Sequence, residues 1–316
     1  MYTQGQMHNL TSFSDFLLLG FSDIQELQIL NFFGFAAIYL AAMTGNLLII
    51  VAVALDHHLH TPMYFFLVNL AIVDLGLISV LVPKAMANCL MDSRSISYFG
   101  CAAQVFMYLL FAGSDFSFLV IMAHDHYVAI CSALQYETIM HKGSCIWMAA
   151  GAWISGLLYA VLHTGGTFGI TFCSNIINQF FCEIPQLLKL SCSDLYLVEM
   201  SLLIFSFVLM MGCFTFIVLT YVKIFAIVLR IPSVKGQKKA LSTCIPHLTV
   251  VSLLVFTGLF AYGRPPANTS SDLDIVFAVI YAILPPLLNP FIYTMRNKAM
   301  KGALLKLFRS EHFCNH

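Results

Sequence analysis

The chain has 316 residues, of which 60% are hydrophobic and only 9% are charged, and its formal net charge is zero. Soluble globular domains carry roughly 25% charged residues, so this composition excludes an ordinary soluble enzyme or binding domain. It is typical of a protein that crosses the membrane several times, and we expect no nucleic-acid partner.

Seven stretches of the chain are long and apolar enough to cross a membrane. A helix that crosses the ~30 Å hydrocarbon core needs about 20 residues. Five stretches lack any charge, and two contain a single aspartate each. In chain order they are Leu27–Leu55, His57–Pro83, Ser95–His124, Gly143–Cys182, Met200–Val222, Ala240–Gly263 and Ile275–Met295. The sequence therefore predicts an all-α membrane protein built as a seven-transmembrane helix bundle.

The basic residues predict which ends of these helices face the cytoplasm, where Lys and Arg are enriched. With the N-terminus outside, four of them lie on the outer side: Lys84, Arg94, Lys189 and Arg264. Eleven lie on the inner side: Lys142, Lys223, Arg230, Lys235, Lys238, Lys239, Arg296, Lys298, Lys301, Lys306 and Arg309. We therefore predict a multi-pass plasma-membrane protein with its N-terminus outside and its C-terminus inside.

This topology divides the chain into three parts: an extracellular tail (1–25), a membrane domain (26–295) and a cytoplasmic end (296–316). The tail lacks the basic segment of a cleavable signal peptide. Asn9 lies in a glycosylation sequon on this tail and is a better acceptor than Asn268, which lies in a short outer loop. In the cytoplasmic part, Lys298–Phe308 alternates basic and apolar residues at helical spacing. It predicts an amphipathic helix on the inner leaflet; the alternative is a frayed tail.

Ten cysteines are distributed over both sides of the membrane. Five fall in cytoplasmic or membrane positions and should be reduced: Cys131, Cys145, Cys213, Cys244 and Cys314. Cys89 lies near the outer end of the second span, and the other four lie on the oxidising side: Cys101, Cys173, Cys182 and Cys192. Four cysteines allow three pairings, and spacing does not choose among them. Two bridges would hold the long loop after Gly165-Gly166 as a lid over the outer end of the bundle, and a loop of that length is usually functional.

Two aspartates lie inside the apolar stretches, at similar predicted depths. A carboxylate in the bilayer costs several kcal/mol unless it is paired, hydrated or bound to a cation. At 1.5 Å per residue, Asp115 lies about 21 Å below Cys101, and Asp74 lies about 18 Å from the inner start of its helix. Together with Asn46 and Asn289 they would form an oxygen-rich pocket suited to a hydrated Na⁺. The alternative is that one aspartate is protonated and hydrogen-bonded to the other.

Five motifs occur in a fixed order along the chain. They are Gly45-Asn46, Leu59–Leu67 (LHTPMYFFL), Met122–Cys131 (MAHDHYVAIC), Lys239–Leu248 (KALSTCIPHL) and Pro286–Tyr293 (PLLNPFIY). In this order and topology the chain resembles the odorant (olfactory) receptors, a branch of the rhodopsin-like G-protein-coupled receptors. The resemblance runs from Phe16–Phe21 to Phe308, and it implies a location in olfactory neuron cilia.

The resemblance implies roles for particular residues. It implies disulfides Cys101–Cys182 and Cys173–Cys192, with Cys89 as a buried free thiol, and a sodium site in which Asp115 replaces the more usual Glu. It also implies an activation switch that meets a Gs/Golf-type G protein, formed by Asp125, His126, Tyr127, Tyr221, Asn289, Pro290 and Tyr293. For Pro290, the alternative is a kink in the helix that takes no part in switching.

The resemblance further implies a ligand cavity in the upper bundle. Its expected lining is Tyr108, Leu109, Ala112, Gly113, Phe205, Ser206, Leu209, Val255, Gly258, Leu259, Tyr262, Val279 and Ala282, with Ile184 as a cap. None of these residues is charged, and an enclosed apolar cavity with few polar groups suits a small, neutral, volatile molecule. For each residue the alternative is ordinary helix packing.

The chain departs from the family pattern at two positions. His126 replaces the usual arginine, and it is shorter, lacks the bidentate fork and titrates near pH 6.5 when unperturbed. We therefore expect weaker or pH-sensitive coupling, unless local changes compensate or the chain is a poorly signalling variant. Val255 is small and apolar where the family often has a larger side chain, which makes a polar ligand contact at that position less favourable.

Other functions fit the sequence less well. A transporter or channel also holds intramembrane carboxylates, but no broken-helix repeat is present. No Gly-x-Ser-x-Gly or His-Glu-x-x-His motif indicates an enzyme. The runs His57–His60 and His124–His126 could suggest a metal, but both fall at the cytoplasmic edge. The main alternative is a non-olfactory chemosensory receptor of the same fold.

Overall fold

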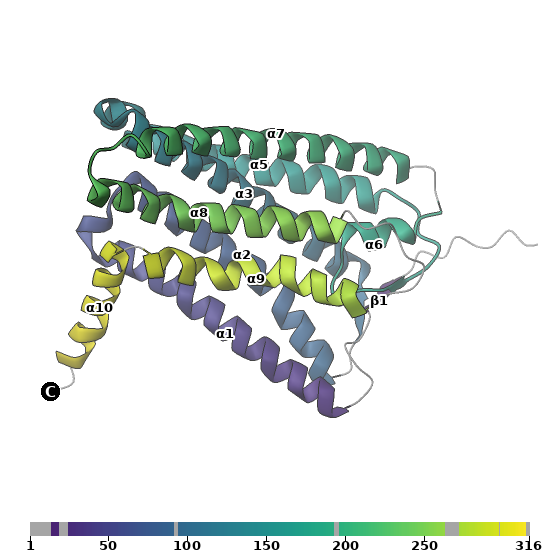
Figure 1. Cartoon of the computed structure of the whole chain (residues 1–316). Coiled ribbons are helices and arrows are strands. Elements are labelled where there is room, and N and C mark those ends of the chain that lie inside the picture. The colour runs from purple at the N-terminus through teal and green to yellow at the C-terminus, as the bar shows by residue number, and fades with distance from the viewer. Residues whose placement is uncertain are drawn as a thin grey trace, which may run out of the picture.

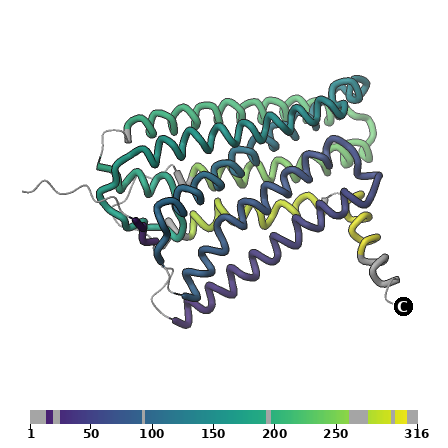
Figure 2. The backbone as a smooth tube through the Cα atoms, turned by 180° about the vertical axis from the view of Figure 1, so that it is seen from behind, coloured from purple at the N-terminus to yellow at the C-terminus, as the bar shows by residue number. Residues whose placement is uncertain are grey.

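The computed structural model describes residues 14–18, 25–91, 94–192, 196–262, 272–296 and 298–313. Within these residues, seven helices are long and apolar enough to span a membrane. They are α1 (Gln25–Leu55), α2 (Pro62–Met91), α3 (Tyr98–Cys131), α5 (Lys142–Phe168), α7 (Tyr196–Val228), α8 (Val234–Tyr262) and α9 (Asp272–Arg296). They form one elongated bundle (Figures 1 and 2). The predicted seven-helix architecture is confirmed.

The cytoplasmic end of the bundle carries short helical connections and one further helix. The connections are η1 (His57–Leu59), η2 (Ala133–Gln135) and α4 (Tyr136–Ile139). Helix α10 (Lys298–Phe313) turns away from α9 at this end (Figure 1). It buries Met300 and Ala303 against the inner core. The predicted helix beginning at Lys298 is therefore present and continues to Phe313.

The outer end of the bundle carries a small sheet that the sequence did not predict. Strand β1 (Asp15–Leu18) lies between β2 (Ser95–Ser97) and β3 (Ile176–Ile177), antiparallel to the first and parallel to the second. Phe16, on β1, is fully buried, and its ring packs against those of Tyr98 and Phe172. The segment before the first span is thus an integral part of the outer surface.

Several helices run past the predicted span boundaries, and two of these differences have a clear physical reason. Helix α2 continues past Pro83 to Met91, because a proline within a membrane helix is tolerated when neighbouring groups satisfy the freed backbone. Helix α5 continues through Gly165-Gly166 to Phe168. The loop that follows is not featureless either, since it contains β3, α6 (Ile184–Lys189) and a bridge between Phe172 and Ser191.

Helices α3 and α5 pack closely because small residues lie at their crossing. A side-chain carbon added at Gly113 would lie 3.1 Å from the Cα atom of Gly156. One added at Gly156 would lie 2.5 Å from the carbonyl oxygen of Leu110, closer than real contacts allow. Close approach of this kind is typical of membrane helices, in which van der Waals packing drives association. This close packing holds α3 against α5, and the functional residues described below are arranged around α3.

Candidate functional site

Two disulfides attach the long loop at the outer end of the bundle. Cys101 pairs with Cys182, and Cys173 pairs with Cys192, with Cα–Cα distances of 5.6 and 5.7 Å. These are the pairs that the resemblance implies. Cys89 is free and buried, as expected. The loop is thus tied to the first turn of α3 and closed upon itself.

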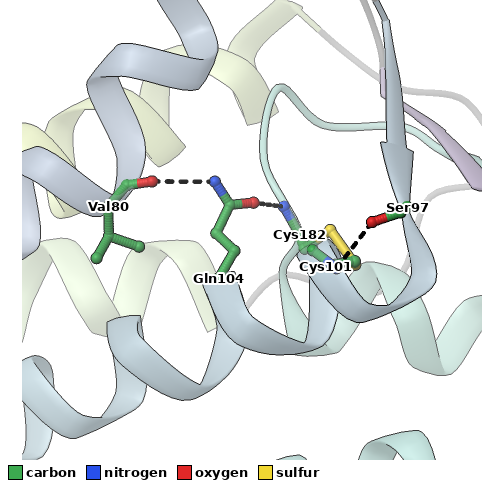
Figure 3. The surroundings of a disulfide bond; sticks show 6 residues. Val80, Ser97, Cys101, Gln104 and Cys182 are labelled. Carbon is green, nitrogen blue, oxygen red and sulfur yellow. Dashed lines mark hydrogen bonds between the residues drawn. A yellow bond between two sulfur atoms is a disulfide. The ribbon is translucent and has the colours of Figure 1, made fainter.

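Gln104 reinforces the first of these attachments, and the sequence analysis missed it. Its Nε2 donates to the carbonyl oxygen of Val80 at 3.1 Å, and its Oε1 accepts from the backbone N–H of Cys182 at 2.9 Å (Figure 3). One amide therefore joins α2, α3 and the loop beside the disulfide. A glutamine one turn after a cysteine was the only available signal, and it is a weak one.

The structure brings some of the expected ligand-lining residues together and places the others elsewhere. Leu109, Ile184, Val255 and Ala282 are buried. Tyr108, Ala112, Leu259 and Val279 are partly buried and pack against the same apolar clusters. The loop covers this region, because Phe181 packs against the Tyr108 ring with centroids 6.0 Å apart. These residues come from α3, α8, α9 and the loop.

The expected lining residues on α7 lie differently. Phe205 and Leu209 are 61% and 54% exposed. The buried stripe of α7 runs instead through Glu199, Ile217 and Tyr221. Of the remaining expected residues, Gly113 packs against α5, a side-chain carbon at Gly258 would meet nothing within 4 Å, and the Tyr262 side chain lies outside the described residues. Asn9 also lies outside them.

A buried polar cluster joins α5 to α7 in the outer half of the bundle. Nδ1 of His163 lies 2.6 Å from Oε1 of Glu199, and Nε2 of His163 lies 2.8 Å from the Ser206 hydroxyl. His163 and Glu199 are both buried, and the second Glu199 oxygen has no hydrogen-bond partner. Gly166 lets the carboxylate approach, because a side-chain carbon there would occupy the position of that oxygen. Ser206, expected to face the ligand, is engaged by His163.

The two motif asparagines hold α1, α2 and α9 together near the middle of the bundle. Pro290 has no N–H to donate to the Pro286 carbonyl one turn earlier, and that carbonyl accepts from Asn46 Nδ2 at 3.1 Å. Gly45 permits the approach, since a side-chain carbon there would lie 2.9 Å from Pro290. Asn289 Nδ2 donates to both carboxylate oxygens of Asp74, at 3.2 and 3.0 Å.

These hydrogen bonds use the amide nitrogens of the two asparagines and leave several oxygen atoms without a hydrogen-bond partner. Oδ1 of Asn46, Oδ1 of Asn289 and Oδ1 of Asp115 are all buried without a hydrogen-bond partner. The hydroxyl of Tyr293, which interacts electrostatically with Asp115 and Asp74, also has no hydrogen-bond partner. Hard cations prefer such oxygen ligands. The residue types and their unsatisfied oxygens therefore fit the sodium site expected from the sequence.

At the cytoplasmic end, a chain of hydrogen bonds connects α3, α7 and α8. His247 Nε2 lies 2.9 Å from the Leu119 carbonyl and must donate to it. In a neutral ring Nδ1 is then an acceptor, so the Tyr221 hydroxyl, 2.9 Å away, donates to it. The Tyr221 oxygen accepts in turn from Nδ1 of His126 at 2.8 Å. His126 is thus a hydrogen-bond donor that points into the bundle.

Asp125 points to a different partner. Its Oδ1 accepts from the Tyr136 hydroxyl of α4 at 2.8 Å, and burial beside this carboxylate raises the pKa of Tyr136. Tyr127 faces α7 at a surface groove that it shares with Lys223. Throughout the described ranges, no three His, Cys, Asp or Glu side chains group as a metal site, so the histidine runs form none there.

Comparisons with known proteins agree with this arrangement. Residues 35–311 match the family model described as olfactory receptor. The chain is 48% identical to Olfactory receptor 14A16 of Homo sapiens over 306 residues, covering 96% of this chain and 99% of that protein. It is 48% identical to Olfactory receptor 14I1 of Homo sapiens (97% and 99% covered) and 43% identical to Olfactory receptor 1G1 of Gorilla gorilla gorilla (95% and 96% covered).

The chain belongs to the olfactory receptor family. As an olfactory receptor it is a seven-helix G-protein-coupled receptor of the plasma membrane and not an enzyme. The receptor places His126 where its family usually has arginine, and it uses that histidine to bond Tyr221 instead of Asp125. The inner latch of this receptor, defined here as His126, Tyr221 and His247, therefore consists of three side chains joined in one chain of hydrogen bonds.

Proposed function

We propose that the receptor binds small, neutral, hydrophobic, volatile odorants in its upper bundle and activates a Gs/Golf-type G protein, raising cAMP. The observation that carries the proposal is the buried apolar region around Tyr108, covered by the disulfide-held loop. None of the expected lining residues is charged, and Glu183, buried on the loop, is an acidic side chain that interacts electrostatically with Tyr108. Since Ser206 bonds His163, Tyr108, whose ring packs against Phe181 of the loop, is the hydrogen-bonding side chain that we expect an odorant to use.

Activation would act on the inner latch. If α8 moves outward at its cytoplasmic end, the Tyr221–His247 bond and the bond from His247 to the Leu119 carbonyl must break. An odorant shifts this equilibrium only by as much as it prefers the open bundle. The G protein then enters the space that opens below the latch, with Lys235, Lys238 and Lys239 beside it on α8.

Coupling should be weaker than in relatives with an arginine, or sensitive to pH. His126 lacks the charged fork that an arginine would offer to a G protein. It also serves as a donor to Tyr221, so it supports the resting arrangement and is not free to contact a partner below.

We further propose that Na⁺ binds between Asp74 and Asp115. The support is the set of buried oxygens without hydrogen-bond partners at Asn46, Asn289 and Asp115. The ion would supply positive charge that offsets the two carboxylates. Asp74 and Asp115 would hold it, with the amide oxygens as further ligands.

An odorant panel on cells expressing the receptor tests the first proposal. Wild-type cells should respond to neutral apolar odorants with cAMP, and Ala112→Trp should abolish the response by filling the region beside Tyr108. Ile154→Trp is the matched control, because Ile154 is 55% exposed on α5 and faces outward. A response through calcium alone would contradict Gs/Golf coupling, and full activity of Ala112→Trp would contradict the binding region.

A further inference from the structure

A shallow groove of about 270 Å³ lies on the surface between α3 and α7 at the cytoplasmic end of the bundle. Tyr127 of α3 forms one wall. The other wall consists of Lys223, Ala226 and Ile227 of α7 and Arg230, which follows that helix. Lys223 also interacts electrostatically with Cys131, the last residue of α3, which places the groove at the inner edge of the membrane.

Helix geometry aligns the α7 wall. Residues spaced by three and four positions share one face of a helix, as Lys223, Ala226 and Ile227 do, and Arg230 continues the row in the turn after the helix. Two cations therefore flank an apolar floor, about 10 Å apart along the helix axis. An acyl chain could lie on the floor while both cations reach one headgroup.

The two cations are not neutralised by an acidic side chain within the described part of the chain. Neither Lys223 nor Arg230 makes an ion pair or side-chain hydrogen bond there. Two acidic side chains at this end are engaged elsewhere: Lys306 binds Asp56, and Tyr136 binds Asp125. Unpaired cations beside an apolar floor favour a ligand that is anionic at one end and apolar along the rest.

We propose that this groove binds an anionic phospholipid of the inner leaflet, with its phosphate between Lys223 and Arg230 and the Tyr127 hydroxyl as a further donor. The cytoplasmic leaflet is rich in such lipids, and each basic residue near its surface contributes substantially to binding. The long stems of Lys and Arg lie along apolar surface and carry the charge to the headgroup region. A soluble phosphate would gain nothing from Ala226 and Ile227, so we commit to the lipid.

The site lies close to the inner latch. Lys223 is two residues after Tyr221, and Tyr127 follows His126, so the groove and the latch share two neighbouring segments. A lipid bound to both α3 and α7 would hold these helices at their observed spacing. This consequence rests on the proposed receptor function, whereas lipid binding itself does not.

The test uses the full-length receptor in nanodiscs made of phosphatidylcholine alone or with phosphatidylserine of matched chains. Native mass spectrometry then counts the lipids that remain bound after the receptor is released from the nanodisc. Wild type should retain phosphatidylserine over phosphatidylcholine. Lys223→Gln/Arg230→Gln should weaken this preference about thirtyfold, because each cation near an anionic surface contributes about fivefold. Lys235→Gln/Lys238→Gln, which removes two cytoplasmic charges outside the groove, should keep the preference.

Other results would overturn the proposal. Equal losses in both double variants would indicate diffuse attraction and no site. Equal competition by soluble glycerophosphoserine would indicate an anion site that does not use the apolar floor. If the groove variant retains the lipid but loses G-protein activation, its cations are G-protein contacts. Should that variant misfold, Ala226→Glu is the second probe, since a carboxylate on the floor must repel the phosphate. Odorant responses play no part in these readouts, so a failure here is distinguishable from failure of the proposed function.

Discussion

Nδ1 of His163 and Oε1 of Glu199 lie 2.6 Å apart, and both side chains are buried between α5 and α7. Helix α7 buries fewer of its residues than the other spans do, so a polar bond of this kind carries a large share of its attachment. The orientation of α7 in turn decides where Ser206 and the inner latch residue Tyr221 lie. The pair therefore supports both the outer and the inner functional regions.

Removing one partner of this pair should destabilise the receptor. Glu199→Ala leaves the buried His163 nitrogen without an acceptor, and a buried donor left unsatisfied in this way costs about 1–3 kcal/mol. Glu199→Gln keeps an acceptor oxygen and should lose less. Thermal unfolding of the purified receptor in detergent measures the difference. Glu26→Ala is the control, since Glu26 is exposed in the first turn of α1, and equal melting temperatures for the two alanine variants would refute the assignment.

His126→Arg should strengthen signalling. It restores the planar charged fork and removes a neutral donor from the latch, so the maximal cAMP response to an odorant should rise severalfold after normalisation to surface expression. His58→Arg, at an exposed position of η1, controls for added charge. Identical dose–response curves for wild type and His126→Arg would reject the hypothesis.

Asp115→Asn should remove the dependence of the receptor on sodium. The variant lacks one of the two negative charges that attract Na⁺, so its affinity for the ion should fall at least about tenfold. Wild type should melt at higher temperature in sodium chloride than in choline chloride, while the variant should melt at the same temperature in both. Ser117→Ala, which removes a hydroxyl that bonds Ser155 on α5, should keep the sodium effect. A wild type indifferent to sodium would eliminate the site.

The contact between α10 and the first inner loop should weaken at low pH. Hydrogen bonds from Lys306 and then from the His58 backbone lower the pKa of Asp56 below 3.8. A lowered carboxyl pKa contributes stability that is present above the unfolded value and lost as pH falls through the folded value. The contact should therefore be constant from neutral pH down to about pH 5 and be lost only well below pH 4. A spin label at Lys301 would report the release, and Asp56→Asn should show the released spectrum at every pH.

The helices and their order were predictable, because apolar length is a local property of the chain. All seven spans and the helix from Lys298 follow from it. Their ends were harder, since Pro83 and Gly165-Gly166 would stop a helix in water but are tolerated where neighbouring helices support the backbone. The outer sheet was missed because β1 has only four residues and pairs with segments far along the chain.

Some of the functional residues could likewise be predicted from the sequence, and others could not. Asp74, Asn289 and the disulfide cysteines stand out because their residue types are unusual where they occur. His163 and Glu199 each look like ordinary residues until the fold brings them together across 36 positions. The direction of His126 was also hidden, because sequence places it next to Asp125 while the helix turns the two side chains apart.

Strand β1 has a consequence for how the molecule is assembled. The Asp15 carbonyl accepts a hydrogen bond from Asn175, 160 residues later. During synthesis β1 therefore remains unpaired with β3 in the lumen until four membrane helices have been inserted. Only then does it find its second neighbour, and pairing over such a separation is slow. A chaperone that shields Phe16 during this interval should increase the amount of receptor that leaves the endoplasmic reticulum, and a deletion of β1 should change that amount as well.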